Sequence, residues 1–364
     1  MKIFRIHLVD LVLLLLAYHC CAQQFTIQDS HTTESLRGLS LLKHGIAWAS
    51  GTHGTYLRSI DGGHTWKASQ VFGADNLDFR DVQAFNLTDA YLLAAGPGDA
   101  SRIYKTTDGG LHWTRQFTNT NPKGFFDCMA FWDTNHGIAV GDPVPDEQGR
   151  LKFELIATED GQHWNPLPSA RLPSAVANEG AFAASGTCIT TQGKRNVWFA
   201  TGGAVARVFH SADRGQTWTV SETPITHGPD SAGIFSIAFS DARHGVIAGG
   251  DYKQPTQGSA SLAFTNDSGQ TWRLSPIAPQ FYISAIAFTS KKGLLAAGAA
   301  HAAYAPPNDF VILSGAKDLC TFESRCLSWN HLWDFNLNAV ATDSKGNAIG
   351  VAPKGTIVVF SGLR

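Results

Sequence analysis

The chain has 364 residues, of which 36 are glycine, 10 are tryptophan and only 16% are charged. This composition is typical of an all-β protein rich in turns and argues against a disordered chain or an integral membrane protein. The formal net charge of −2 provides no basic surface field, so we expect no nucleic-acid partner.

The beginning of the chain has the pattern of a secretory signal peptide. Lys2 and Arg5 form a positive end, an apolar run follows over residues 8–17, and small residues end the segment. We therefore expect an exported protein, periplasmic or extracellular, in which residues 1–22 are removed and residues 23–364 form a single domain. The apolar run is short for a bilayer span and no other run is long enough, so we expect no membrane span in the mature chain.

The cysteines leave two questions open. A lipid anchor on Cys20 or Cys21 is the less favoured alternative to simple export, because bulky residues stand where small ones precede a lipid-modified cysteine. The mature cysteines can pair in an oxidising compartment, but for Cys128 and Cys188 we favour two separate buried side chains over a bridge. The 14 histidines are scattered and no Cys/His set has metal spacing, so we expect no metal and no cofactor.

An eight-residue turn recurs along the chain. Its first copy, residues 59–66 (SIDGGHTW), follows the rule Ser/Thr, any residue, Asp, any residue, Gly, any residue, usually Thr, and Trp. Further copies are residues 106–113, 211–218, 265–272 and, more loosely, 157–164. The looser copy has Glu159 in the Asp position. Because every copy keeps the glycine three residues before the tryptophan, we interpret the turn as a structural repeat.

Each position of this turn has a physical role. A short carboxylate accepts hydrogen bonds from nearby backbone N–H groups, and the glycine adopts a positive φ that other residues resist. The tryptophan begins the next strand and buries a large apolar face. The residues to which we assign this structural role are Asp61, Gly63, Trp66, Asp108, Gly110, Trp113, Gly161, Trp164, Asp213, Gly215, Trp218, Asp267, Gly269 and Trp272.

The spacing of the turns predicts the architecture. The closing tryptophans are Trp66, Trp113, Trp164, Trp218, Trp272 and Trp329, and they stand 47 to 57 residues apart. Such periods are typical of propeller blades. Each unit contains four strand-like runs, for example residues 80–85, 91–96 and 102–106 and a fourth run that begins at Trp113. We expect each blade to be a four-stranded antiparallel sheet.

The sixth unit is interrupted. A turn starts near Asp309 and ends at Trp329, but the residues between them fit no propeller pattern. We interpret residues 311–325 as an insertion at a turn tip, where insertions are tolerated; a functional loop is the alternative. Cys320 and Cys326 lie within and beside this segment, and whether they form a local bridge stays open.

The two ends of the chain complete the ring. Residues 336–341, 347–351 and 356–360 supply three strands without a fourth, and the alternating residues 24–28 can supply it. Closure of this kind removes the free sheet edges that invite aggregation. The prediction is an all-β, seven-bladed β-propeller, closed by an N-terminal strand that completes the last blade, and a monomer.

The recurring turn matches the Asp-box, or BNR repeat, and the chain resembles the Asp-box β-propellers. Within that group it is similar to secreted bacterial propellers related to the photosystem II stability and assembly factors. The resemblance covers nearly the whole mature chain and implies the fold. It does not identify the activity or a photosynthetic host, because Asp-boxes occur in sialidases, other glycosidases and non-catalytic propellers.

The ligand site is expected on the face opposite the turns, at the mouth of an axial funnel. The connections between second and third strands and between blades share that face. The residues expected there to bind a ligand are Arg80, Asp142, Glu179, Arg207, Asp251, Tyr252, Lys253 and Tyr282. Taken singly, each has a structural alternative, such as a turn-forming aspartate or a local ion pair.

Two functions compete for this mouth. We favour a non-catalytic module that binds a protein or glycan over a glycoside hydrolase. Hydrolysis needs two carboxylates at a fixed separation, and the candidates are Asp142, Glu179 and Asp251. A sialidase in particular would need an arginine cluster and an early Arg-Ile-Pro signature, whereas here Arg5 and Ile6 are followed by His7 within the leader.

Overall fold

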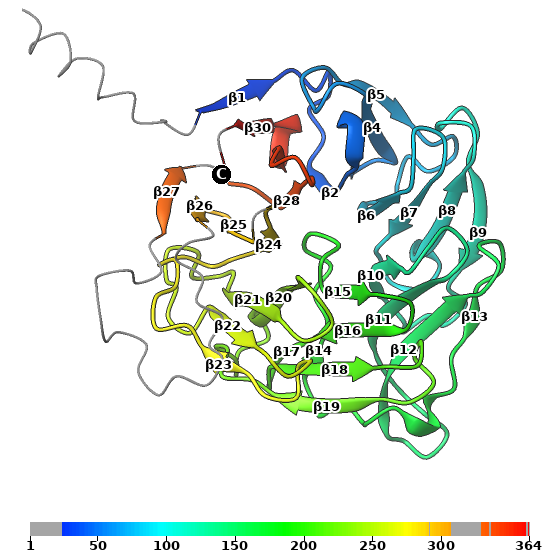
Figure 1. Ribbon diagram of the computed structural model, residues 1–364. Helices are drawn as coiled ribbons and strands as arrows, with labels where there is room; N and C mark the ends of the chain where they lie inside the picture. The colour runs from blue at the N-terminus through cyan, green and yellow to red at the C-terminus, as the bar shows by residue number, and fades with distance from the viewer. Residues whose placement is uncertain (1–23, 291, 307–328, 335, 362, 364) are drawn as a thin grey trace, which may run out of the picture.

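Seven four-stranded antiparallel blades stand around a central axis (Figure 1). The computed structural model describes residues 24–364 with the exceptions of 291, 307–328, 335, 362 and 364. The expected signal peptide and inserted segment therefore lie outside the described residues. The part of the chain that the structure describes has no helix with the length and hydrophobicity needed to cross a bilayer.

The blades follow one another along the chain. Blade 1 contains β2 (Leu36–Leu41), β3 (Ala47–Gly51), β4 (Thr55–Ser59) and β5 (Lys67–Gln70), and blade 2 contains β6 (Phe79–Ala84), β7 (Ala90–Ala94), β8 (Arg102–Thr106) and β9 (Thr114–Thr118). Blade 3 contains β10 (Phe126–Phe131), β11 (Gly137–Pro145), β12 (Leu151–Thr158) and β13 (Asn165–Pro166), and blade 4 contains β15 (Ile189–Gln192), β16 (Asn196–Ala200), β18 (Arg207–Ser211) and β19 (Thr219–Glu222). Blade 5 contains β20 (Ala232–Phe239), β21 (Gly245–Asp251), β22 (Leu262–Thr265) and β23 (Arg273–Leu274), and blade 6 contains β24 (Ala285–Phe288), β25 (Leu294–Ala297), β26 (Ala302–Ala305) and β27 (Asn330–Trp333). Blade 7 contains β28 (Ala339–Thr342), β29 (Ala348–Val351), β30 (Ile357–Ser361) and β1 (Gln24–Gln28).

A few short elements lie between the blades. The pair β14 (Glu179–Gly180) and β17 (Gly202–Gly203) extends the sheet of blade 5 through Gly202, which pairs with Gly233. The described helical segments are single 3₁₀ turns: η1 (Lys43–Gly45), η2 (Gly98–Ala100), η3 (Ser169–Arg171) and η5 (Pro353–Gly355).

The expected closure of the ring is confirmed. β1 pairs antiparallel with β30, from Gln24 opposite Ser361 to Gln28 opposite Ile357. β1 is thus the fourth strand of a blade whose other three strands end the chain. Closure gives blade 7 a neighbour on each side, because Trp66 of blade 1 packs with Val359 of blade 7 in one buried cluster.

Buried clusters occupy the contacts between neighbouring blades, and the turn tryptophans belong to them. Trp218 packs between blades 3 and 4, 5.2 Å from the ring of Phe199. Trp272 packs between blades 4 and 5, and Trp329 contacts the cluster between blades 5 and 6. The ring is therefore held by apolar burial between sheets, to which each indole contributes.

The repeated turns close in the same way in four blades. In the first copy, the N–H of Gly63 donates to Ser59 Oγ (2.9 Å), and the N–H of Thr65 donates to Asp61 Oδ1 (2.9 Å). Trp66 Nε1 donates to the carbonyl of Gly63 (2.8 Å), and Trp218 repeats this bond with Gly215 (2.9 Å), whereas the indoles of the other two copies do not. Gly63 has φ +88°, as the sequence pattern required. Burial acts to raise the pKa of the Asp61 carboxyl, but hydrogen bonds led by those from Thr65 outweigh it and lower the pKa to about 2.

The looser copy has a different register from the one predicted. Asp160, not Glu159, accepts the backbone N–H groups of Gln162 (2.8 Å) and His163 (2.9 Å). Thr158 supplies the hydroxyl that accepts the N–H of Gly161 (2.9 Å). The aspartate stands directly before the glycine, so this turn is one residue shorter. The assignment of the Asp position to residue 159 was wrong because the spacing to the tryptophan was assumed to be constant.

The preference for two separate thiols in blades 3 and 4 was also wrong. Cys128 and Cys188 form a disulfide, with Cα atoms 6.2 Å apart, and both side chains are fully buried in the cluster between these blades. The connection between blades 3 and 4 is therefore covalently fixed where it enters β15. Cys320 and Cys326 lie outside the described residues.

Candidate functional site

The ring has two unlike faces. The first-to-second and third-to-fourth strand connections form one face, which carries the repeated turns and is called the turn face. The second-to-third strand connections and the connections between blades form the other, called the mouth face. All eight residues predicted to bind a ligand lie on or near the mouth face, but they separate into several groups.

A single segment of the chain fills the centre of the mouth face. Residues 181–186 precede β15 and reach into the space inside the ring, as the green segment in Figure 1 shows. The N–H of Ala181 donates to Asp142 Oδ1 of blade 3 (3.0 Å), Arg80 Nη1 of blade 2 donates to the carbonyl of Ala183 (3.1 Å), and Ser185 Oγ donates to the carbonyl of Ser284 beside blade 6 (2.9 Å). The axial funnel expected from the sequence is thus occupied by the protein's own backbone.

An aromatic stack, a hydrogen bond and close packing at a glycine hold this central segment in place. The rings of Phe182 and Phe235 stack with centroids 3.9 Å apart, and Thr187 Oγ1 donates to Ser236 Oγ (2.7 Å). Gly186 has φ +74°, and a Cβ there would lie 2.5 Å from Asp81 Oδ1, so no other residue fits without a shift. The segment is therefore anchored on several blades.

Two arginines and one aspartate form a charged group next to this segment. Arg80 Nε donates to Asp78 Oδ2 (2.7 Å), and Arg37 Nε lies 3.8 Å from the same oxygen. Arg37 Nε and Asp78 Oδ1 are buried and have no hydrogen-bond partner within the protein. Burial and the neighbouring charge of Arg80 lower the pKa of Arg37. Sequence reasoning missed Arg37, the second residue of β2, because no motif marks it.

Two carboxyls lie together on blade 3 beneath the central segment. Asp127 on β10 lies at the register shift between Phe126 and Cys128, and Asp142 on β11 lies at the shift between Gly141 and Pro143. Burial raises the pKa of Asp142 to about 6. Burial first, and the neighbouring Asp142 second, raise the pKa of Asp127 well above its usual range. The pair was not predicted as a pair, although Asp142 was named.

Glu179 and Arg207 bind each other. Arg207 Nε donates to Glu179 Oε1 (2.9 Å) and its Nη2 forms a short contact with Oε2. Glu179 also accepts from Thr201 Oγ1 (2.8 Å) and from the N–H of Val176 (2.9 Å), and its side chain is fully buried. Every carboxylate oxygen of Glu179 is therefore bonded within the protein.

The blade 5 residues form a turn with an exposed aromatic tip. Asp251 accepts from the N–H of Lys253 (2.9 Å) and from Gln254 Nε2 (3.2 Å), so it shapes the loop. Tyr252 is 48% exposed. Tyr282 is buried, with its ring 4.7 Å from Phe235, and burial raises its pKa. Of these residues only Tyr252 and its exposed neighbour Lys253 present surface to a partner.

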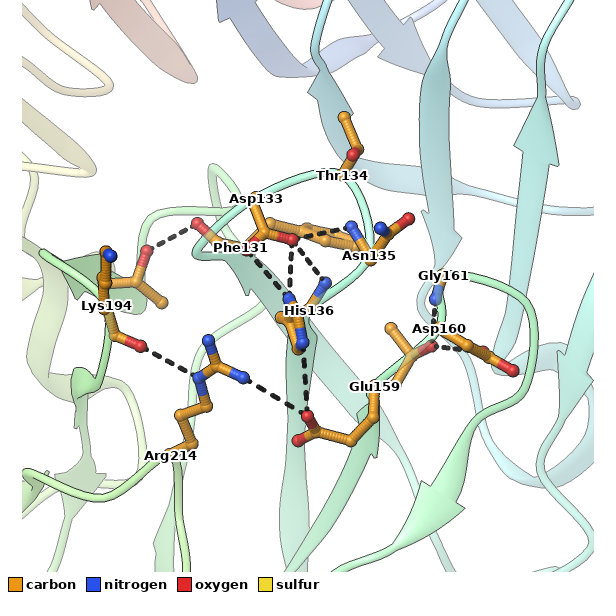
Figure 2. Close-up of polar contacts among 12 residues, drawn as sticks. Phe131, Asp133, Thr134, Asn135, His136, Glu159, Asp160, Gly161, Lys194 and Arg214 are labelled. Atoms are coloured by element: carbon orange, nitrogen blue, oxygen red, sulfur yellow. Dashed lines mark hydrogen bonds and ion pairs between the residues drawn. The ribbon is translucent and has the colours of Figure 1, made fainter.

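The turn face carries its own polar network between blades 3 and 4 (Figure 2). Glu159 Oε2, which the short turn leaves free of the turn itself, lies 3.3 Å from Arg214 Nη1 and 3.5 Å from His136 Nε2. His136 Nδ1 contacts Asp133 Oδ1 (2.7 Å), and Arg214 Nε donates to the carbonyl of Lys194 (2.9 Å). The network links neighbouring blades and has partners for each charge, which is a structural arrangement.

A pocket of about 300 Å³ lies between the outer parts of blades 2 and 3 rather than on the axis. Its wall combines the rings of Phe117, Phe126 and Phe153 with two acids, Asp146 and Glu154. Asn121 Nδ2 donates to Glu154 Oε1 (3.0 Å), and burial raises the pKa of Glu154. None of the residues predicted for the site lines this pocket.

Comparison with known proteins supports the fold and indicates relatives. No family model matches the chain. A curated relative, the photosystem II assembly lipoprotein Ycf48 of Synechococcus sp. (strain CC9902), is 24% identical over 249 residues, which cover 60% of this chain and 69% of the relative. The solved structure of YCF48 from Cyanidioschyzon merolae matches with a TM-score of 0.58 at 17% identity, over 92% of this chain and 98% of that one. The RRP9 WD40 repeats match with a TM-score of 0.60 at 10% identity, over 93% and 97%. The chain is a seven-bladed β-propeller that resembles Ycf48.

Proposed function

We propose that this propeller is a non-catalytic module that binds a protein partner through its mouth face. The observation that carries the proposal is the use of the predicted catalytic carboxylates within the fold. Glu179 is neutralised by Arg207, and Asp251 holds its own loop. A glycosidase needs an acid and a second carboxylate that face the substrate, and these two residues face the protein.

The similarity to Ycf48 supports a protein as partner. The curated relative is a photosystem II assembly lipoprotein, and a role in assembly is consistent with contact with other proteins. Since a sequence identity of 24% does not transfer a named partner, the proposal is limited to the class of partner. A glycan remains the other class of ligand, because an exposed tyrosine stacks well on sugars.

The contact surface proposed here is the rim beside the central segment. It contains the exposed Tyr252 and Lys253. Tyr282 interacts electrostatically with both Tyr252 and Arg37, and so relates these residues to the group of Arg37, Arg80 and Asp78. A tyrosine offers apolar area with one polar end, and it is enriched where proteins bind each other. The Arg37 side chain is 29% exposed, so the accessible part of its guanidinium can donate to a carboxylate or a backbone carbonyl of a partner.

Export is also part of the proposal. The basic end and apolar run of residues 1–22 support a leader, and Cys20 and Cys21 provide the alternative of a lipid anchor. Mass spectrometry of the protein from its own host would distinguish an N-terminus at Gln23 from a lipid-modified cysteine.

Affinity capture from an envelope extract tests the binding proposal. A double variant, Tyr252→Ala with Lys253→Glu, changes the rim, while Ile60→Ser with Leu111→Ser changes two exposed apolar residues on the turn face. We expect a protein that the wild type and the turn-face variant retain and whose capture by the rim variant falls about tenfold or more, since an aromatic anchor is commonly worth about 2 kcal/mol. Retention by all three proteins would contradict the mouth-face assignment.

One observation favours the second candidate, a glycoside hydrolase. Asp142 has a pKa raised to about 6 by burial, which suits a general acid, and Asp127 lies beside it. Aryl glycosides test this directly: turnover by the wild type that Asp142→Asn abolishes would replace the binding proposal with catalysis.

A further inference from the structure

Three side chains of blade 6 converge at the mouth face. His301 directly precedes β26, His331 lies on β27, and Asp334 directly follows β27. His301 Nδ1 lies 2.7 Å from Asp334 Oδ1, and His331 Nε2 lies 3.0 Å from the same oxygen. The two imidazole nitrogens are 3.2 Å apart.

Protons alone cannot satisfy these three contacts. Each ring nitrogen carries at most one proton, and that proton can point at one acceptor only. Two protons therefore make at most two of the three contacts into hydrogen bonds, and the remaining pair of electronegative atoms stays in contact without one. A cation placed between the three atoms would satisfy all of them at once.

The distances are those of a small coordination site. Metal bonds of 2.0–2.2 Å to nitrogen and oxygen at tetrahedral angles place the ligand atoms roughly 3.3 Å apart. The observed separations of 2.7, 3.0 and 3.2 Å are only slightly shorter. Small outward movements of the exposed His331 and Asp334 side chains would complete the geometry.

We propose that His301, His331 and Asp334 form a binding site for one divalent transition-metal ion, with Zn²⁺ as the reference ion. Two imidazoles and one carboxylate suit Zn²⁺, Ni²⁺ or Cu²⁺ and disfavour Mg²⁺ and Ca²⁺, which prefer oxygen. Three protein ligands leave at least one position for water or for a side chain of a partner.

The framework holds two of the ligands in place. Ala303 pairs with His331 across the β26–β27 ladder, so the strand that carries one ligand is bonded to the strand beside the other. The carbonyl of His301 accepts the N–H of Gly298 (3.0 Å), and the ring of Phe281 lies 5.4 Å from the His301 ring. A bound ion would connect the outermost strand of blade 6 to the turn ahead of β26, and this should stabilise the blade.

The sequence pattern did not show this set. His331 and Asp334 have a short spacing, but His301 is separated from them by thirty positions, and only strand pairing brings it near. Other Asp–His pairs with a spacing of three residues, such as Asp160 with His163, have no second histidine at hydrogen-bond distance among the described residues. They supply a matched control.

Metal titration of the full, untagged chain tests the proposal. Co²⁺ provides a visible absorption that reports on coordination, and Zn²⁺ titration calorimetry measures stoichiometry and affinity. We expect one equivalent of ion to bind, with an affinity that falls by about tenfold or more in each of His301→Ala, His331→Ala and Asp334→Asn. We expect His163→Ala to bind as the wild type does. Zn²⁺ should raise the thermal midpoint of these two proteins and leave that of the variants without the site unchanged.

Two results would overturn the proposal. One is the absence of saturable binding of a single equivalent up to about 1 mM ion. The other is unchanged binding in His301→Ala or Asp334→Asn, which would place the ion on a pair of residues elsewhere. His331 and Asp334 are exposed and His301 is partly exposed, so circular dichroism of each variant separates loss of the site from loss of the fold.

Discussion

The turn face is made of repeated turns, whereas the mouth face is made of connections that differ from one another. On the turn face four turns repeat one set of bonds, and the N–H of the turn glycine lies 2.8 or 2.9 Å from the Ser/Thr hydroxyl in each. On the mouth face the connections differ in length and content, from residues 52–54 in blade 1 to residues 167–188 between blades 3 and 4. Repetition fixes the ring, and the variable connections create the specific surface.

The carboxyl groups of the two faces also differ, in the direction in which their pKa values are shifted. Aspartates of the repeated turns are stabilised as anions, because hydrogen bonds outweigh burial and lower their pKa values, as for Asp61. The mouth-face carboxyls Asp127 and Asp142 are destabilised as anions, because burial dominates. The two faces should therefore respond in opposite directions to pH and to substitution.

The largest expected effect is on the tryptophans of the turn face. Trp218→Ala should lower the free energy of unfolding by about 3–5 kcal/mol, since it removes a buried indole between blades 3 and 4. Urea unfolding followed by circular dichroism would measure this. The control is Phe72→Ala on a mouth-face connection, where the ring is fully exposed and the change should stay within about 0.5 kcal/mol. Similar losses in both variants would break the comparison between the faces.

The second-largest effect on the free energy of unfolding is expected on the mouth face, at the ion pair of Glu179 and Arg207. Arg207→Met leaves the buried carboxylate of Glu179 without its cation and should cost about 3 kcal/mol of unfolding free energy. Adding Glu179→Gln should recover a large part of that loss, because the uncompensated charge is removed. A double variant no more stable than Arg207→Met would show that packing, not charge, is the function of this pair.

A smaller effect of opposite sign is expected at Asp142. Its pKa of about 6 in the folded state lies above the usual value of about 3.9 in the unfolded chain, so the folded protein binds the extra proton. Stability should therefore fall as pH rises from about 4 to 6, and Asp142→Asn should be more stable than the wild type by roughly 2 kcal/mol at pH 7. Thermal unfolding between pH 4 and 7 measures both slopes. A wild-type stability that rises with pH through this window, with no difference in the variant, would contradict the prediction.

The smallest effect is expected at Asp61. Its folded pKa of about 2 lies below the unfolded value, so its contribution is complete above about pH 4 and is lost as pH falls toward 2. Asp61→Asn should cost no more than about 1 kcal/mol at neutral pH, because solvent screens this exposed turn. The difference between variant and wild type should shrink on acidification, and a constant difference from pH 2 to 7 would argue against the charge.

The sequence alone determined the fold of this protein. The repeated Ser/Thr-Asp-Gly-Trp pattern and its period gave the blade count, and the pattern of residues 24–28 gave the closing strand. The blade count succeeded because a turn and its indole are local features, set by residues within eight positions of each other. The closing strand pairs across the whole chain, from Gln24 to Ser361, and was found because the last unit lacked a fourth strand. When the same local unit recurs along a chain, each copy packs on its neighbours, and few topologies are compatible with that arrangement.

Only the tertiary structure decided the content of the mouth face. It placed the central segment 181–186 across the axis, bonded Glu179 to Arg207, and paired Cys128 with Cys188. It also brought His301 to His331. Each of these contacts joins residues that are far apart along the chain and belong to no repeat. Their distances are set by ring closure and side-chain packing, and no spacing rule in the sequence encodes them.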